Sequence, residues 1–171
     1  MDTLNKLENW LASVYKGTPK LRSESKKSIV NLWPVVALVL GALQLIAAYE
    51  LWHWGHRVNQ VANLVNSITQ YYGGSNLGVH LNAFYWASLV AVLIDGVILL
   101  AAYSGLKKRQ KSGWNLLFYG TLLNLVYGVF SAFNNYGGVG SLILQIIVSA
   151  IVFYFLFQIR DQYTGAKPQS A

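Results

Sequence analysis

The chain contains no cysteine, only three prolines and few charged residues. The absence of cysteine excludes disulfides, thiolate metal sites and cysteine nucleophiles. Charged side chains make up 11% of the 171 residues, compared with about 25% in soluble domains, whereas 54% of the residues are hydrophobic. This composition excludes an ordinary soluble domain and favours a small polytopic membrane protein.

Apolar stretches near the length of a membrane span recur along the sequence. A transmembrane helix needs about 20 mostly apolar residues, and the sequence predicts spans at about 29–52, 84–103, 114–133 and 141–159. The expected fold is therefore all-α: an integral membrane bundle of four transmembrane helices over 29–159. Residues 1–28 are expected to form a cytoplasmic amphipathic helix with a basic linker, and 160–171 a flexible cytoplasmic tail.

Two amphipathic helices are predicted outside the spans. In the first, at about 3–16, apolar residues recur every three or four positions, which favours a helix lying in the membrane interface. Docking on a partner protein is the alternative. The second helix is predicted at about 57–71, on the external side between the first two spans. Its polar face is almost uncharged, so we expect it to pack over the mouth of the bundle rather than bind anionic lipid. The apolar positions of the second helix are Val58, Val61, Leu64, Val65 and Ile68.

The distribution of basic residues sets the expected orientation. Six Lys and Arg residues precede the first span and four lie between the second and third. By the positive-inside rule both termini are cytoplasmic, and the protein is a multi-pass protein of the cell membrane. We therefore attribute the formal net charge of +7 to the orientation of the protein in the membrane rather than to nucleic-acid binding. Lys107, Lys108, Arg109 and Lys111 are also candidates for contacting lipid headgroups.

One carboxylate, Asp95, interrupts the second span. A charged side chain at this depth costs roughly 2.5–3.5 kcal/mol, so it should face protein or water. Stripes of small residues with polar members occur on all four spans and place Asp95 inside the bundle. From helical rise we expect two polar layers, with Asp95 hydrogen-bonded to Asn124 below and Gln44 paired with Gln145 above. Asp95 belongs either to an ion or proton pathway or to a hydrogen bond that fixes helix register.

Glu50, His53 and His56 are the only concentration of metal-ligand residue types. On a continuous helix they lie within about a 120° arc, so a shared metal ion is geometrically possible. The fourth ligand would have to be His80, from a distant loop position. The alternative is that these are solvated side chains at a helix exit.

Three function classes follow. The first is a non-catalytic accessory, scaffold or interaction subunit, with the lipid bilayer, a second copy or another membrane protein as partner. The second is a transporter or channel component for a small solute, ion or proton that uses the Asp95 seam. The third is a metal-dependent membrane enzyme using Glu50, His53 and His56. No phosphate-binding, dinucleotide or hydrolase motif is present, so we expect no enzyme activity and no cofactor.

Overall fold

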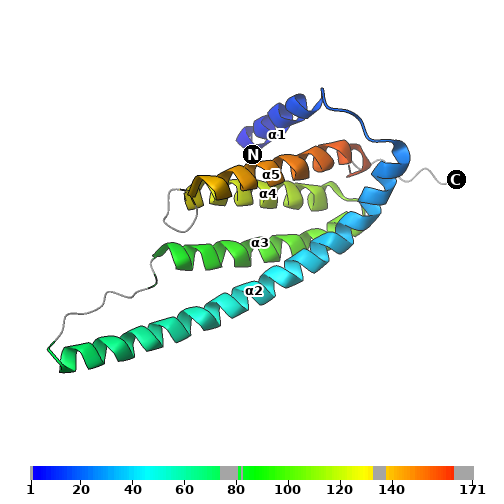
Figure 1. The fold of residues 1–171 in the computed structure, drawn as a ribbon. Coiled ribbons are helices and arrows are strands. Elements are labelled where there is room, and N and C mark those ends of the chain that lie inside the picture. The colour runs from blue at the N-terminus through cyan, green and yellow to red at the C-terminus, as the bar shows by residue number, and fades with distance from the viewer. Residues whose placement is uncertain (1, 74–80, 82, 133–137, 164–171) are drawn as a thin grey trace.

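The computed structural model describes residues 2–73, 81, 83–132 and 138–163, and these residues form an all-helical chain without strands. A helix at the N-terminus precedes four longer helices and a terminal 3-10 turn (Figure 1). Their bounds are α1, Asp2–Tyr15; α2, Ser23–Tyr71; α3, Ala83–Lys107; α4, Lys111–Ala132; α5, Gly138–Gln158; and η1, Arg160–Tyr163.

Helices α2, α3 and α4 are each long and apolar enough to cross a membrane. The apolar part of α5, Leu142–Gln158, is shorter. Three of the four predicted spans are therefore found as helices of span-like length and composition.

The first span and the predicted external helix are one continuous helix of 49 residues. The prediction of a separate helix at about 57–71 is wrong. Gly55 does not end α2, because it packs against α3: a Cβ atom there would lie 2.9 Å from the Tyr85 ring. The Tyr85 hydroxyl also donates a hydrogen bond to the Leu51 carbonyl (2.5 Å). At 1.5 Å per residue α2 is about 70 Å long, and it extends well beyond the start of α3 (Figure 1).

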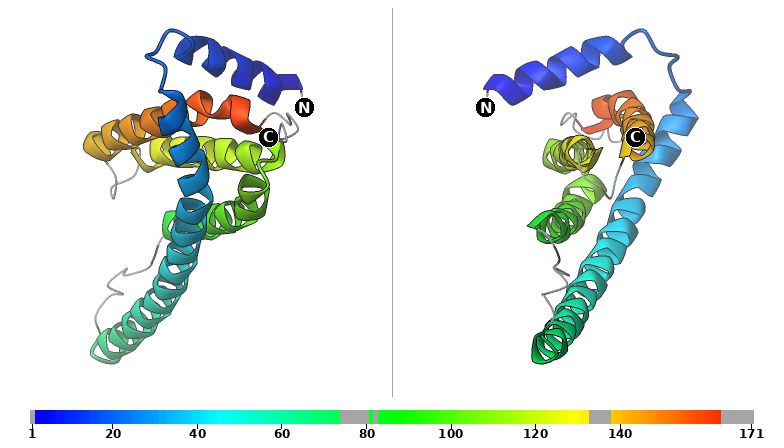
Figure 2. Two further views of the ribbon diagram at one scale, coloured as in Figure 1. Left: turned by 90° about the vertical axis from the view of Figure 1, so that its right-hand side faces the viewer. Right: turned by 60° about the vertical axis from the view of Figure 1, so that its left-hand side comes forward.

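The helices pack in chain order. Among the described residues α2 packs on α3, α3 on α4 and α4 on α5, with no comparable packing between α5 and α2. In the right-hand view of Figure 2, α5 is seen nearly end-on while α1 lies across the view, so α1 crosses α5 rather than running beside it.

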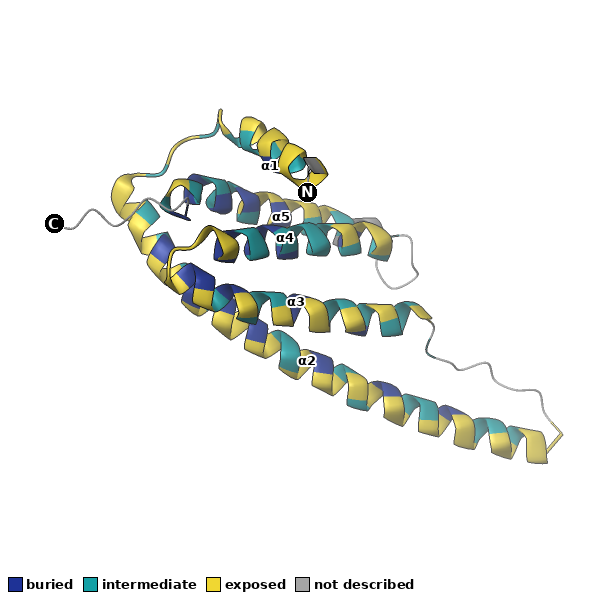
Figure 3. Ribbon diagram, turned by 180° about the vertical axis from the view of Figure 1, so that it is seen from behind, coloured by how far each residue is buried: buried dark blue, intermediate teal, exposed yellow. Residues whose placement is uncertain are grey.

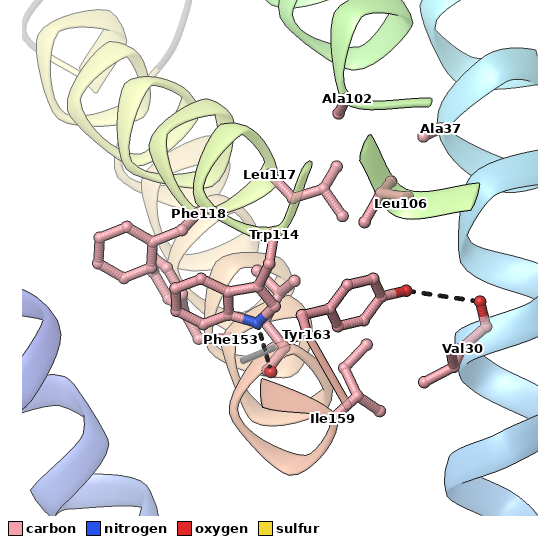
Figure 4. Close-up of a cluster of buried hydrophobic side chains, with 11 residues drawn as sticks. Val30, Ala37, Ala102, Leu106, Trp114, Leu117, Phe118, Phe153, Ile159 and Tyr163 are labelled. Atoms are coloured by element: carbon pink, nitrogen blue, oxygen red, sulfur yellow. Dashed lines mark hydrogen bonds between the residues drawn. The ribbon is translucent and has the colours of Figure 1, made fainter. Parts of the chain in front are cut away.

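An aromatic core joins the helices at the end of the bundle where α2 begins (Figure 4). Trp114 is completely buried there, and its indole Nε1 donates to the Leu156 carbonyl (2.8 Å). The Tyr163 hydroxyl donates to the Val30 carbonyl (3.5 Å), and burial raises the pKa of this phenol to about 12, which keeps the donor protonated. The sequence predicts a flexible tail over 160–171, but Arg160–Tyr163 is helical and Tyr163 is packed in the core. Residues 164–171 lie outside the described residues.

Helix α1 docks on its own chain. The Tyr15 ring stacks on Phe157 with centroids 5.5 Å apart, and its hydroxyl donates to the Ala150 carbonyl (3.1 Å). Glu8 is buried and lies 2.5 Å from Arg160 Nη2. Exposed residues nevertheless run along the outer side of α1 (Figure 3), including Trp10 at 61% exposure. The helix therefore has a docked side and an apolar side without cover from the described residues.

Candidate binding cavity at Asp95

Small residues bring the helices around Asp95 close together. Gly41 of α2 faces Gly96 of α3, and a Cβ atom on Gly41 would lie 3.1 Å from the Gly96 carbonyl oxygen. On the other side, a Cβ atom on Gly120 of α4 would lie 3.1 Å from Asp95 Oδ1. The close approach of backbones that such residues permit is typical of membrane helix packing. It leaves Asp95 3% exposed, between α2 and α4.

One oxygen of the Asp95 carboxylate is held by amides from both neighbouring helices. Asn124 Nδ2 donates to Oδ2 over 3.0 Å, which is the hydrogen bond that the sequence predicts. Gln44 Nε2 donates to the same oxygen over 2.7 Å. The prediction of two separate polar layers is therefore wrong for Gln44. The contact between Gly41 and Gly96 sets the register, and it puts Gln44, one turn beyond Gly41, level with Asp95.

Gln145 lies on the opposite wall, on α5. Its side chain packs on Gly128 of α4, where an added Cβ atom would meet Gln145 Cβ at 3.0 Å. The predicted pair of Gln44 with Gln145 is not formed. The Gln44 amide instead donates to Asp95, and the Gln145 side chain packs on Gly128.

A partly open cavity of about 300 Å³ lies between the four helices. All four predicted seam residues line it, together with Ser149, which belongs to the predicted polar stripe of the fourth span, and Thr121, which the sequence pattern does not single out. Its polar lining residues are Gln44, Asp95, Thr121, Asn124, Gln145 and Ser149. The remaining lining is chiefly aliphatic, with Trp33 among the lining residues of α2.

Three buried polar atoms on the cavity lining have no hydrogen-bond partner. They are Asp95 Oδ1, Gln44 Oε1 and Trp33 Nε1. Asp95 is the one ionisable residue among the described lining residues, so no lysine, arginine or histidine of this lining balances its charge. A buried charge normally requires a partner, and the residue that carries this charge lines a cavity of about 300 Å³.

The predicted metal ligands are not brought together. No group of three His, Asp or Glu residues that could hold a metal ion occurs in the described part of the chain. His53 Nε2 lies 2.9 Å from the Tyr49 hydroxyl, and His56 Nδ1 donates to the Trp52 carbonyl (3.0 Å). Glu50 is exposed. Glu50, His53 and His56 therefore do not form the predicted centre, and His80 lies outside the described residues.

The basic residues of the α3–α4 turn are exposed, but three of them contact other side chains of the protein. Arg109 Nη2 donates to Asn31 Oδ1 (3.3 Å). Lys111 Nζ lies 3.9 Å from the buried Glu8 carboxylate. Lys107 lies over the Tyr103 ring at 5.7 Å from its centroid. Together with the exposed Lys108, these cations remain accessible to a headgroup while they also join α1, α2 and α4.

Among the described residues, the cavity and its polar lining are the features that bear on function. No protein-family model, no curated protein and no solved structure matches this chain.

Proposed function

We propose that the chain is a four-span protein of the cell membrane with both termini in the cytoplasm. The apolar segment Leu142–Gln158 of α5 supports the fourth span, because α5 lies beside α4 in the same bundle. The basic residues gather at the end of the bundle that holds the α3–α4 turn, which supports the orientation. In this arrangement α1 lies at the cytoplasmic interface, with Trp10 directed to lipid and Glu8 to the bundle.

Within this frame we propose that the protein binds and transports a small solute, ion or proton at Asp95. The observation that carries the proposal is the buried carboxylate with one oxygen unpartnered, on the lining of a partly open cavity. Ionisable groups within membrane spans mark ion and substrate pathways. With a single ionisable side chain on the lining, the cavity is better suited to binding than to acid–base catalysis, which needs a donor and an acceptor of protons.

Replacing Asp95 by Asn should abolish transport. The amide keeps the size of the side chain and one acceptor oxygen for the amides of Gln44 and Asn124, but it removes the charge that attracts a proton or cation. In liposomes containing the purified protein, Asp95-dependent proton, sodium or amine flux should fall at least about tenfold, to the level of empty liposomes.

Glu50→Gln is the matched control, because it removes an exposed carboxylate from α2 outside the cavity lining. Its flux should equal that of the parent. Absence of flux in the parent protein, or equal flux in the parent and Asp95→Asn, contradicts the transport proposal.

A second candidate function, an interaction subunit, rests on the distal half of α2. This half extends beyond α3 (Figure 1) and exposes apolar residues such as Val61 (60%) and Ile68 (50%). Apolar positions alternate at spacings of four and three, the pattern of a coiled-coil seam. The seam is Trp54, Val58, Val61, Val65 and Ile68. Arg57 is the one charged residue between His53 and Tyr72, so two copies side by side in one membrane would meet little like-charge repulsion.

Adding charge to this seam should break self-association. The parent is expected to crosslink as a dimer or higher oligomer in membranes. Val61→Glu combined with Ile68→Glu should reduce the crosslinked fraction at least about fivefold, because it buries like charges at the seam. Asn63→Glu together with Gln70→Glu adds the same charge off the seam and should leave the fraction unchanged. A monomeric parent, or equal loss in both double variants, contradicts a self-associating α2.

A further inference from the structure

The groups left unpartnered in the Asp95 cavity identify the chemistry of its ligand. From them we propose that the cavity binds an amphiphilic organic ammonium: a small cation with N–H donors and an attached apolar group. The inference rests on the proposed function of the same site and names the class of solute.

The charge of the ligand follows from the lining. Asp95 is only 3% exposed, and the described lining residues include no cationic side chain. A carboxylate in such surroundings is stabilised by an opposite charge brought into the cavity. An anionic ligand would place two negative charges together at low dielectric and is excluded by the same reasoning.

At Asp95 the unpartnered buried atoms are acceptors, whereas the unpartnered donor of the lining, Trp33 Nε1, lies nearer the start of α2. Asp95 Oδ2 already accepts from two amides, whereas Asp95 Oδ1 and Gln44 Oε1 are buried acceptors without partners. These two acceptors belong to side chains that both line the cavity and are joined by the 2.7 Å hydrogen bond from Gln44 Nε2 to Asp95 Oδ2. An ammonium group carries up to three N–H donors and can donate to such acceptors, whereas a quaternary ammonium or a bare hydrocarbon cannot.

The walls favour an organic cation over a metal ion. Hard metal cations take about six or more oxygen ligands, but most of the surface of this lining is apolar. Leu40, Leu99, Val148 and Val152 are among these wall residues. A largely apolar pocket with a few convergent polar groups is typical of organic ligands, and about 300 Å³ is at the small end of their range. The ammonium would lie at Asp95 and the apolar group along these walls.

The position of the cavity allows such a ligand to arrive from the membrane. It is partly open, and among the described residues the packing between α5 and α2 is the weakest of the four sides. Near the start of α2 this side is closed, where the Trp33 and Phe155 ring centroids lie 6.5 Å apart. An amphiphilic ligand dissolved in the membrane could therefore enter between α2 and α5 at the level of Asp95.

Binding by the full chain in lipid nanodiscs tests the proposal with isosteric probes. Phenethylammonium should bind with one site per chain, and phenethyl alcohol, which has a similar shape without charge, should bind at least about 30-fold more weakly, since the lost partner of a buried charge is worth about 2 kcal/mol or more. Phenylacetate should not bind, and sodium ions should not compete at equal concentration. Equal affinity for the ammonium and the alcohol, or no binding of the ammonium, overturns the proposal without the need for any variant.

Two variants locate the site. Asp95→Asn should lower the affinity for phenethylammonium about 30-fold or more, and Glu50→Gln should leave it unchanged. Val148→Trp keeps Asp95 and both amide donors but fills the apolar side of the cavity, so it should weaken phenethylammonium at least about tenfold and spare methylammonium. Unchanged affinity for phenethylammonium in Asp95→Asn, or in Val148→Trp, places the ligand elsewhere and overturns the assignment.

The failures of the two proposals are distinguishable. Proton or sodium flux that depends on Asp95, without binding of phenethylammonium, leaves the transport function standing and overturns the ligand class. Binding of phenethylammonium at Asp95 without any flux supports the ligand class and contradicts transport.

Discussion

Replacing Gly113 by Ala is expected to destabilise the native α3–α4 hairpin strongly. A Cβ atom on Gly113 would overlap the backbone nitrogen of Leu106 and the carbonyl carbon of Gly105, and a Cβ atom on Gly105 would lie 2.7 Å from the Gly113 nitrogen. Since these neighbours are backbone atoms, they cannot rotate away as a flexible side chain could. The conflict requires the two helices to separate.

The surrounding structure makes that separation costly. The turn is fixed by hydrogen bonds from the backbone N–H of Gln110 to the Gly105 carbonyl (2.8 Å) and from that of Gly113 to the Gln110 carbonyl (3.2 Å). The next residue is Trp114, the fully buried centre of the aromatic core. A shift at Gly113 therefore displaces this ring as well. We expect a loss of about 3 kcal/mol or more in the free energy of unfolding, at the upper end of overpacking effects.

Denaturant unfolding of the purified protein in detergent, followed by tryptophan fluorescence, measures this loss. The matched control is Gly140→Ala in α5, where an added Cβ atom meets nothing within 4 Å. That change should be neutral or stabilising by up to about 1 kcal/mol, because alanine is the better helix former. A Gly113→Ala protein within about 0.5 kcal/mol of the parent would show that the backbones do not pack as closely as described.

The contacts that the sequence predicts best are those between helices joined by short connections. Asn124 was matched to Asp95 by counting helical rise from a short turn that makes α3 and α4 antiparallel neighbours, and the hydrogen bond is present. The same counting misplaced Gln44, because α2 reaches α3 through a long connection and its register is set by the fit of Gly41 against Gly96. Such a fit depends on the shapes of two surfaces, which rise per residue does not describe.

Long-range contacts explain the other differences. A glycine followed by a polar, uncharged segment suggested that the helix ends near Gly55, but Tyr85 of α3 packs on that glycine and the helix continues. In the sequence, Glu8 is one of several polar residues of the amphipathic helix predicted at about 3–16. Its partner Arg160 lies near the other end of the chain, and no local pattern connects the two. The one hint in the sequence was that the charge at Arg160 directly follows a predicted span.

Removing the positive charge of Arg160 should release α1 from the bundle. Arg160→Met leaves the buried Glu8 carboxylate with Lys111, whose Nζ lies 3.9 Å away, in place of the guanidinium at 2.5 Å. It also removes the guanidinium that lies 5.8 Å from the Trp114 ring centroid. Breaking a buried ion pair costs about 3–5 kcal/mol. Arg160 is 30% exposed and Lys111 remains, so we expect about 2–3 kcal/mol after discounting for solvent screening.

Hydrogen exchange of the α1 amides measures this local free energy, because α1 can detach while the rest of the bundle stays folded. A loss of about 2–3 kcal/mol corresponds to exchange about 30- to 150-fold faster in α1, with little change in α4. Lys16→Met removes a positive charge from the exposed end of the same region and should leave α1 protected. Unchanged exchange in Arg160→Met contradicts a stabilising ion pair.

The double variant Glu8→Leu, Arg160→Met separates the loss of the pair from the cost of an unpaired charge. If the damage in Arg160→Met comes from a carboxylate left buried without its guanidinium, removing that carboxylate as well should restore most of the protection of α1, because a hydrophobic replacement of a buried pair is often neutral or stabilising. Exchange in the double variant as fast as in Arg160→Met would show instead that the arginine stem and its contact with Trp114 hold α1. Recovery would show that α1 is docked chiefly by apolar contacts, including the stacking of Tyr15 on Phe157, and that the ion pair selects the position at which it docks.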